Sequence, residues 1–482
     1  MAGILGGLQP EKVFYYFEEL SKIPRGSNHE KQVSDFLYQW AQGKNLEVVQ
    51  DKALNIIIKQ PGTGGYENSA AVILQGHMDM VWEKNQATVH DFLHDPLKLR
   101  IVGDDIYATG TTLGADDGIA VAYAMAILDS SEIPHPPLEV VFTTDEENGM
   151  SGMENLNPEQ EQLRGRILIN LDCEDEGIFT AGCAGGGRVK FTLPIIKATS
   201  QFKNFYKLTV KGLKGGHSGI DIDKERANSI KLLGRILYDL KDNIEIAGIA
   251  GGSKANAIPR ESWAVVTVND QFNLEDAINQ WNQRLKHELM FTDAEVQVLT
   301  EKADATAQVY DEKVKQDIIH LINLIPYGPA NRDLERDLVI YSNNLGVIAT
   351  DEDEKKITFI CSPRSSVRSL FNQFIDFAEQ LGEILHIDVE IASLYPSWEY
   401  AKESKIRDLC LRVYQDVTGM KGQINVIHAG LECGIFMEKI PDLDAISLGP
   451  TMVGVHTPNE HLSISSTRRM FEFLCELLKR LK

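Results

Sequence analysis

The sequence predicts an α/β protein: a discontinuous α/β domain, with a central mixed sheet flanked by helices, that carries an inserted α+β domain. Three observations support this expectation. Helix-like and strand-like segments alternate early in the chain, the pattern changes after residue 186, and the first pattern returns after residue 397. We therefore expect residues 1–186 and 398–482 to form one domain and residues 187–397 to form the other.

The first part of the chain reads as helices layered over a buried sheet. Apolar residues recur at helical spacing in residues 12–23 and 30–45, and the small-residue run 117–130 is expected to be a buried helix. Short apolar or β-branched runs, typical of buried strands, lie at residues 46–50, 55–60, 70–76, 138–144 and 166–172. Several of these strands end at or near polar residues, and sites in open α/β sheets gather at such ends.

The inserted part contains two series of strands and helices. The first has strands at 205–212, 262–269 and 294–300 and helices at 224–240 and 274–290. The second has helices at 311–325 and 366–385 and strands at 338–350, 355–366 and 387–394. Two such series predict two similar α+β halves of ferredoxin-like type. The glycine-rich residues 180–191 before them are expected to form a hinge or turn.

The composition restricts the class of partner. The chain of 482 residues has 70 Asp and Glu against 48 Lys and Arg, a net charge of -22, which disfavours nucleic acid and anionic membranes as partners. No apolar run is long enough for a membrane helix, and six scattered cysteines without a C-x-x-C pair are typical of reduced thiols. We expect a cytoplasmic protein, and the sequence leaves open whether it forms a homodimer.

Three adjacent carboxylates, Asp145, Glu146 and Glu147, follow the strand in "EVVFTTDEENGMSG". Adjacent carboxylates repel one another unless a cation or water compensates their charge. Taken alone, the triplet is explained by a solvated acidic loop.

Other polar residues stand at comparable places, in "LQGHMDMVW", "GADDGIAVA", "NLDCEDEG" and "TMVGVHTP". A surface histidine or an ordinary aspartate helix cap would explain each one in isolation. Together they supply two histidines and several carboxylates, which are the ligands of a zinc or manganese pair. The residues concerned are His77, Asp79, Asp116, Asp117, Asp172 and His456.

In this order, H-x-D, G-A-D-D-G, D-E-E-N-G-M-x-G, N-L-D-C-E-D-E-G and G-P-T-x-x-x-V-H-T-P resemble the dinuclear-metal exopeptidases, the group of carnosinases, tripeptidases and amino-acid deacylases. Within this group the resemblance is strongest to the bacterial aminoacyl-histidine dipeptidases. It covers nearly the whole chain. It implies a catalytic domain, an inserted lid domain, a small peptide as substrate and two divalent ions per chain: zinc, with manganese or cobalt as alternatives.

The resemblance also implies roles for single residues. Asp116 would bridge the two ions, and Glu146 would be the general base on a water between them. Asp79 would orient His77. Asp145 and Asp117 receive no ligand role, and we expect Asp145 to be a solvated spectator. The implied metal ligands are His77, Asp116, Glu147, Asp172 and His456.

Further residues resemble substrate-binding positions. In "GGHSG" and "GGSKANAIPRES", His217 would polarise the scissile carbonyl, and Asn256 and Arg260 would hold the carbonyl and the C-terminal carboxylate. Glu432 in "HAGLECG" would bind a free α-ammonium. A plain glycine turn, a surface charge and, for Glu432, a structural salt bridge are the alternatives.

The resemblance, together with the candidate ligands and base, implies a metal-dependent dipeptidase of broad specificity, including Xaa-His, that acts on free termini through a metal-bridged water. A hydrolase of N-acyl amino acids or larger peptides would use the same metals. A binding protein without activity would not need a complete set of ligands and base. A glycosidase using paired carboxylates would leave both histidines unexplained.

Overall fold

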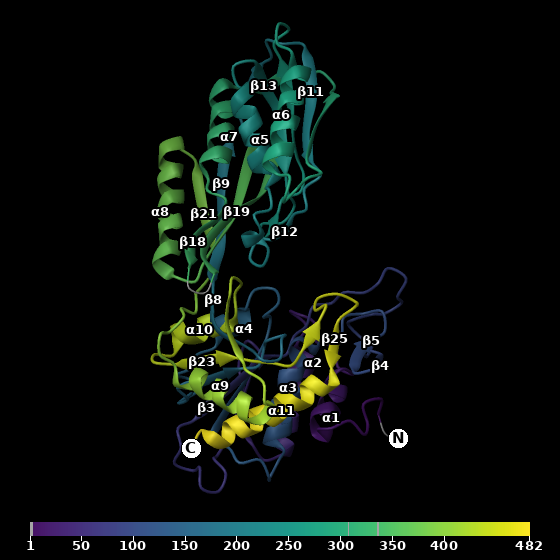
Figure 1. Ribbon diagram of the computed structural model, residues 1–482, viewed down its shortest axis with the longest axis vertical. Helices are drawn as coiled ribbons and strands as arrows, with labels where there is room; N and C mark the ends of the chain where they lie inside the picture. Colours follow the sequence, from purple (N-terminus) through teal and green to yellow (C-terminus); the bar gives the residue numbers. More distant parts are fainter. Residues whose placement is uncertain (1–2, 307, 335–336) are drawn as a thin grey trace. The chain divides into compact units, whose positions relative to one another are not determined.

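The computed structural model describes residues 3–306, 308–334 and 337–482, which form two compact units (Figure 1). Unit 1 comprises Met1–Cys183, Tyr400–Val426 and Leu431–Lys482, and unit 2 comprises Ala184–Glu399 and Ile427–Gly430. None of the helices in the described part of the chain has the length and apolarity needed to cross a bilayer.

Unit 1 is built on an eight-stranded sheet in which parallel and antiparallel neighbours are mixed, as the sequence predicts. Four adjacent strands, β6, β3, β7 and β23, are parallel, and β1 and β2 extend the sheet in antiparallel register. In spatial order the strands are β1 (Glu47–Gln50), β2 (Ile56–Gln60), β6 (Leu138–Thr143), β3 (Val72–His77), β7 (Ile167–Asn170), β23 (Asp444–Ser447), β8 (Ile178–Cys183) and β22 (Gln423–Ile427).

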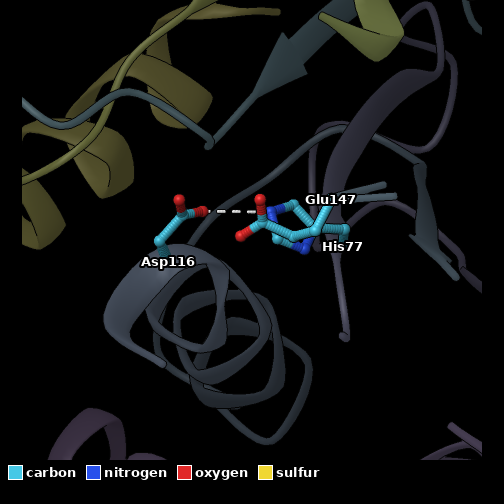
Figure 2. Close-up of side chains that lie close together, drawn as sticks. All are labelled: His77, Asp116 and Glu147. Atoms are coloured by element: carbon cyan, nitrogen blue, oxygen red, sulfur yellow. Dashed lines mark hydrogen bonds and ion pairs between the residues drawn. The ribbon is translucent and has the colours of Figure 1, made fainter. Parts of the chain in front are cut away.

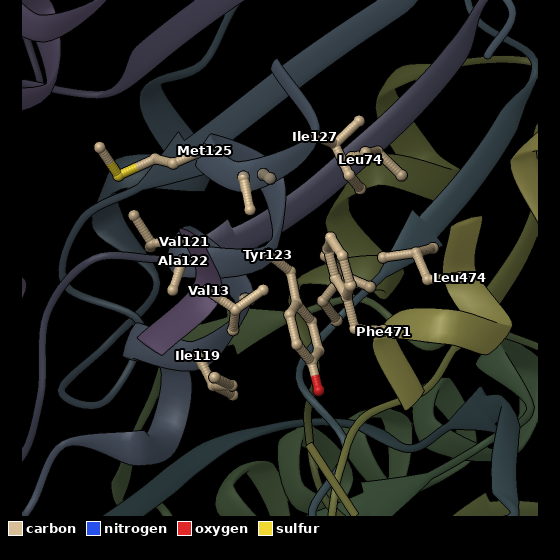
Figure 3. Packing of buried hydrophobic residues seen from close by; sticks show 14 of the residues in the cluster. Val13, Leu74, Ile119, Val121, Ala122, Tyr123, Met125, Ile127, Phe471 and Leu474 are labelled. Carbon is tan, nitrogen blue, oxygen red and sulfur yellow. The ribbon is translucent and has the colours of Figure 1, made fainter. Parts of the chain in front are cut away.

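The core of unit 1 is centred on α3 (Ala115–Leu128), whose residues are all buried. Its small side chains let neighbouring elements approach closely, and a helix that is apolar all round belongs in a protein interior. Figure 3 shows Tyr123 of α3 beside Phe471 and Leu474 of α11. The ring centroids of Tyr123 and Phe471 are 5.5 Å apart, and the Tyr123 hydroxyl donates to the Thr467 carbonyl at 2.8 Å. Helix α3 is thereby fixed against the C-terminal helix.

The other elements of unit 1 complete the layers around this core. A small sheet has the order β24 (Met452–Val453), β25 (His461–Ser463), β5 (Asp105–Ala108) and β4 (Leu99–Val102). The remaining helices are α1 (Glu11–Leu20), α2 (Lys31–Gly43), α4 (Ser151–Asn155), α9 (Lys405–Thr418), α10 (Glu432–Lys439) and α11 (Ile464–Arg480).

Unit 2 contains the two ferredoxin-like halves. In each half the strand–helix–strand–strand–helix–strand order folds so that the first strand lies between the third and fourth, and β13 pairs with β19 to join the halves. One half has β11 (Asn204–Lys211), α5 (Ser229–Leu240), β13 (Ile244–Gly251), β15 (Ser262–Val268), α6 (Leu274–Glu288) and β16 (Gln297–Lys302). The other has β9 (Gly185–Pro194), α7 (Glu312–Leu324), β19 (Leu338–Asp351), β20 (Lys356–Ser365), α8 (Arg368–Leu385) and β21 (Asp388–Tyr395).

Short elements complete unit 2. Strands β10 and β17 form one pair, β12 and β14 form another, and β18 lies beside β19. Their bounds are β10 (Lys197–Thr199), β12 (Gly216–His217), β14 (Ala257–Ile258), β17 (Gln308–Tyr310) and β18 (Gly328–Asp333), with a 3-10 turn at η1 (Ile222–Lys224).

The glycine-rich residues 180–191, where we expected a hinge or turn, form strands in place of a turn, and the border between the two units lies within them, after Cys183. Strands β8 and β9 run through them and leave only Ala184 between. A Cβ at Gly185 would lie 2.5 Å from the Ser397 nitrogen, and one at Gly186 would lie 2.4 Å from the Tyr395 hydroxyl. These glycines therefore permit a close approach inside a strand, which is the other common reason for glycine in a sheet.

Candidate metal centre

The predicted ligands of unit 1 start from the carboxyl ends of three neighbouring strands. Strand β3 ends at His77, β6 ends two residues before Asp145, and β7 ends two residues before Asp172. Because β6, β3 and β7 are parallel neighbours, these ends lie along one edge of the sheet.

Asp116 comes to the same edge from the first turn of α3. Its backbone is not helical there (φ -77, ψ 110), and Gly114 before it adopts the left-handed region with φ 66. One oxygen of Asp116, Oδ1, lies 3.0 Å from Nε2 of His77, and the other, Oδ2, lies 3.3 Å from Nε2 of His456. The contact with His77 is the dashed line in Figure 2. A single carboxylate thus lies between two imidazoles.

The remaining predicted ligands join this cluster. Nε2 of His456 lies 2.8 Å from Oε1 of Glu147, and Nε2 of His77 lies 3.9 Å from Oδ1 of Asp172. The structure therefore brings all five residues together. Two subsets have ligand atoms within 4.8 Å of one another: His77, Asp116 and Glu147, and His77, Asp117 and Asp172.

The pKa values of the clustered side chains are shifted by burial and by one another. Burial raises the pKa of Glu146 and of Asp172 well above the ordinary range, and neighbouring carboxylates add to both shifts. Hydrogen bonds with Asp116 and Glu147 raise the pKa of His456 to about 11. These shifts reflect several carboxylates held close together, and divalent ions would compensate their charge. Imidazole nitrogens and carboxylates are ligands for zinc and manganese, so the residues present fit divalent ions.

Asp79 connects the histidine to the acidic triplet. Its Oδ1 lies 3.3 Å from Nδ1 of His77 and accepts the Glu146 N–H at 3.2 Å, while its Oδ2 accepts the Ser27 hydroxyl at 2.7 Å. Burial opposes ionisation of Asp79, but its contacts with His77 outweigh that cost and lower its pKa. An ionised carboxylate on Nδ1 leaves Nε2 of His77 facing the cluster.

Two neighbours of the ligands, Asp145 and Asp117, are both buried. Asp145 is not a solvated spectator: it is 8% exposed, and its carboxylate accepts hydrogen bonds from Asn28 at 3.0 Å and Ser151 at 2.5 Å. Asp117 is fully buried and accepts the backbone N–H of His77 at 3.2 Å. Its ligand atoms also fall within one of the two subsets, although the sequence assigned it no ligand role.

Comparison with known families agrees with this geometry. The family model described as peptidase family M20/M25/M40 matches residues 73–480, which include both histidines and every carboxylate of the cluster. The chain belongs to this peptidase family. It is 37% identical to the cytosol non-specific dipeptidase of Escherichia coli (strain K12) over 99% of each chain.

Solved structures of other peptidases share the fold. The aminoacylhistidine dipeptidase of Vibrio alginolyticus superposes with a TM-score of 0.90 at 37% identity, covering 99% of this chain and 98% of that one. A tripeptidase of Staphylococcus aureus superposes with a TM-score of 0.56 at 16% identity over 99% of each chain, a likeness in fold alone.

In this peptidase, His217 lies in unit 2 on the short strand β12. The backbone N–H groups of Gly219 and Ile220 both point at its Nδ1, at 3.3 Å, so Nδ1 is the acceptor nitrogen. Burial, with a smaller contribution from Arg364, lowers the pKa of His217, so the ring is neutral and carries its proton on Nε2. His217 therefore has a hydrogen-bond donor at Nε2.

The other predicted residues of unit 2 are exposed. Asn256 accepts the Ser218 N–H on its backbone carbonyl at 2.9 Å, and Nε of Arg260 contacts the Leu213 carbonyl at 3.4 Å. The sequence reasoning overlooked Arg364, which is 7% exposed, donates to the Tyr395 hydroxyl at 2.8 Å and influences the pKa of His217. A strand residue in "SPRSS" carries no local signal, and only the fold brings it near the histidine.

Glu432 is enclosed in unit 1 with no exposed surface. Its Oε2 accepts the Thr143 hydroxyl at 2.6 Å and a hydrogen bond from Gln75, and burial raises its pKa to about 7. No cationic side chain contacts this carboxylate among the contacts of the described residues, which disfavours the salt-bridge alternative. Its burial also weighs against direct contact with a substrate ammonium.

Proposed function

We propose that this peptidase hydrolyses dipeptides with free termini, with broad specificity that includes Xaa-His, using two divalent ions. The observation that carries the proposal is the placement of Asp116 between His77 and His456, one carboxylate oxygen toward each imidazole. A carboxylate with this arrangement can serve two ions at once, which a single-ion site does not require.

The two ions would share Asp116. His77 and Asp172 would complete one site, and Glu147 and His456 would complete the other. Zinc suits this mixture of imidazole and carboxylate ligands, with manganese and cobalt as alternatives. Bound in this way, the ions would supply a water of lowered pKa as nucleophile.

Glu146 is proposed as the general base. Both neighbours in the triplet make side-chain hydrogen bonds. Glu147 contacts His456, and Asp145 accepts from Asn28 and Ser151. Glu146 adjoins the proposed ligand Glu147, and a carboxylate beside the ions that is not itself a ligand can accept a proton from water and return it to the leaving amine. Asp79 is proposed to hold both His77 and the backbone of Glu146 in place.

Unit 2 is proposed to act as a lid that binds the substrate. The Nε2 donor of His217 fits polarisation of the scissile carbonyl. Asn256 is proposed to assist at that carbonyl and Arg260 to bind the C-terminal carboxylate, with Arg364 as a second candidate for the carboxylate. Glu432 is retained as a candidate for the free ammonium, although its burial favours an internal role.

Relatives support the substrate class. The similar proteins of E. coli and V. alginolyticus are named as a non-specific dipeptidase and an aminoacylhistidine dipeptidase. We extend both specificities to this chain, together with a cytoplasmic location. Formation of a homodimer remains a further proposal.

The test is hydrolysis of a matched panel by metal-stripped protein before and after zinc, manganese or cobalt is returned. The panel contains free dipeptides with and without C-terminal histidine, tripeptides, acetylated dipeptides and N-acyl amino acids. We expect metal-dependent cleavage of free dipeptides. Preferred cleavage of acetylated substrates or tripeptides would reassign the substrate class, and cleavage of dipeptides by protein that holds no metal would overturn the mechanism.

A further inference from the structure

Arg25 is a buried cation beside the metal centre that the proposed mechanism does not use. Its side chain is 2% exposed. Nη1 donates to the carbonyls of Met78 and Asp79, each at 3.0 Å, and Nη2 donates to the carbonyl of Gly114. One guanidinium therefore joins the chain that follows His77 to the turn that precedes Asp116.

Glu460 makes the complementary set of contacts from the other side of that turn. It is 2% exposed, and its Oε2 accepts the N–H groups of Leu113 at 2.8 Å and Gly114 at 3.1 Å. Its Oε1 accepts the N–H of Ala115 at 2.7 Å. Glu460 stands four residues after His456, so its carboxylate joins the histidine's loop to the same turn.

The two side chains together connect three segments that bear proposed ligands or support them. Arg25 binds the carbonyl of Gly114, and Glu460 binds the N–H of the same residue. The connected segments are residues 77–79, residues 113–116 and residues 456–460. Because these segments are far apart in the sequence, nothing in the local chain fixes their mutual distances.

The glycines around Arg25 show that the guanidinium occupies a closely fitted place. A Cβ at Gly114 would lie 2.5 Å from Nη2 of Arg25, and a Cβ at Gly118 would also lie 2.5 Å from it. Gly118 follows the non-helical residues Asp116 and Asp117 and opens the regular part of α3. Glycine at this position gives room to the guanidinium.

We propose that Arg25 and Glu460 are positioning residues that set the spacing of His77, Asp116 and His456 before the ions bind. The inference rests on the proposed two-ion function. Partners of metal ligands orient them and tune their affinity for the ion, so the loss of such a partner weakens binding without removing any ligand.

The chemistry of arginine suits this role. Its planar fork presents several donors in fixed directions and can therefore hold carbonyls from two segments at once. Lysine offers a point charge on a flexible stem and cannot reproduce this geometry. The positive charge also lies near Asp79, Asp116 and Asp117, where it offsets part of their repulsion.

A purely structural role would give a different outcome, and the chain offers matched controls for it. Arg407 is 6% exposed and donates to the carbonyls of Ala401 at 2.6 Å and Lys402 at 2.8 Å, in contacts that include no proposed ligand. Glu139 is 5% exposed and accepts the N–H groups of Arg164 and Gly165, each at 2.9 Å. Each control is a buried ion that binds main-chain groups.

The experiment is a calorimetric titration of metal-stripped full-length protein with zinc or manganese, which measures the affinity for the ions. Thermal unfolding is measured in parallel. Arg25→Met, Arg25→Lys and Glu460→Gln are expected to bind the ions about 10- to 100-fold more weakly than the unchanged protein. Arg407→Met and Glu139→Gln should lower the unfolding temperature and leave the affinity unchanged. Unchanged affinity in the first three variants, or an equal loss in the controls, overturns the proposal.

Gly118→Ala provides a variant that keeps every charge. The added methyl group should displace the guanidinium, so we expect weaker metal binding. This variant keeps the test decisive if Arg25→Met does not fold, and unchanged affinity in Gly118→Ala would count against the proposal. If the unchanged protein itself binds no ions, the proposed function fails first, and the two failures are thereby distinguished.

Discussion

Nε2 of His456 lies 2.8 Å from Oε1 of Glu147, although the two residues are 309 positions apart in the chain. The same nitrogen lies 3.3 Å from Asp116. His456 and Glu147 come from the last and the first segments of unit 1, so these contacts join two parts of a discontinuous unit. The candidate centre is therefore a product of the whole unit and not of one motif.

The first prediction concerns metal content. We expect about two divalent ions per chain in protein purified without chelator, because five imidazole and carboxylate ligands exceed a single tetrahedral shell. Elemental analysis measures the number directly, and removal by a chelator should abolish activity. Active protein with no bound metal would contradict the two-ion mechanism.

The second prediction concerns His217. His217→Ala should lower the turnover rate about 10²- to 10³-fold, since a donor aimed at a developing oxyanion contributes on this scale. Metal content should not change, because the proposed ligands all belong to unit 1. Turnover and metal content are measured on the same preparation.

His287→Ala serves as the control, because His287 is an exposed histidine on α6 of the same unit. Its turnover should equal that of the unchanged protein. If His217→Ala keeps the full turnover rate, the segment "GGHSG" around His217 is a plain glycine turn without a catalytic role.

The fold could be predicted from the sequence because its signals are local. Hydrophobic periodicity marks the helices and the buried strands, and their order in the chain is enough to indicate two ferredoxin-like halves. A turn is not what the glycines at residues 185 and 186 form, because the sequence does not show that Ser397 and Tyr395 approach Gly185 and Gly186. Only the fold brings such neighbours together.

In the candidate site, too, some residues could be predicted from local sequence and others gain their contacts only through the fold. His77, Asp116 and Glu147 stand in motifs with distinctive flanks, whereas Arg25, Arg364 and Glu460 stand in ordinary sequence and gain their contacts from distant segments. The burial of Asp145 and Glu432 could not be read from composition either. Both are charged residues, and such residues are buried only where specific partners exist.

The third prediction uses the raised pKa of Glu432. Its pKa is about 7 in the folded protein against an ordinary value of 4.5, so between these pH values the folded state holds a proton that the unfolded state releases. The contribution of Glu432 to the free energy of unfolding therefore falls by about 3 kcal/mol as pH rises through this window. Above the window it no longer changes.

Glu432→Gln should remove this loss. A glutamine oxygen can still accept from Thr143 and Gln75, while the group no longer ionises. In metal-free protein, urea unfolding should show the variant gaining stability over the unchanged protein as pH rises from 4.5 to 7. A difference that does not depend on pH would mean that Glu432 does not titrate in this range.

The last prediction distinguishes the three adjacent carboxylates by two measurements, metal content and turnover. Glu146→Ala should abolish most turnover with both ions retained, because the base is not a proposed ligand. Glu147→Ala should weaken one metal site, since its carboxylate contacts His456. Asp145→Ala should lower stability, because it leaves Asn28 and Ser151 without their acceptor. Loss of an ion in Glu146→Ala with both retained in Glu147→Ala would show that the roles are exchanged.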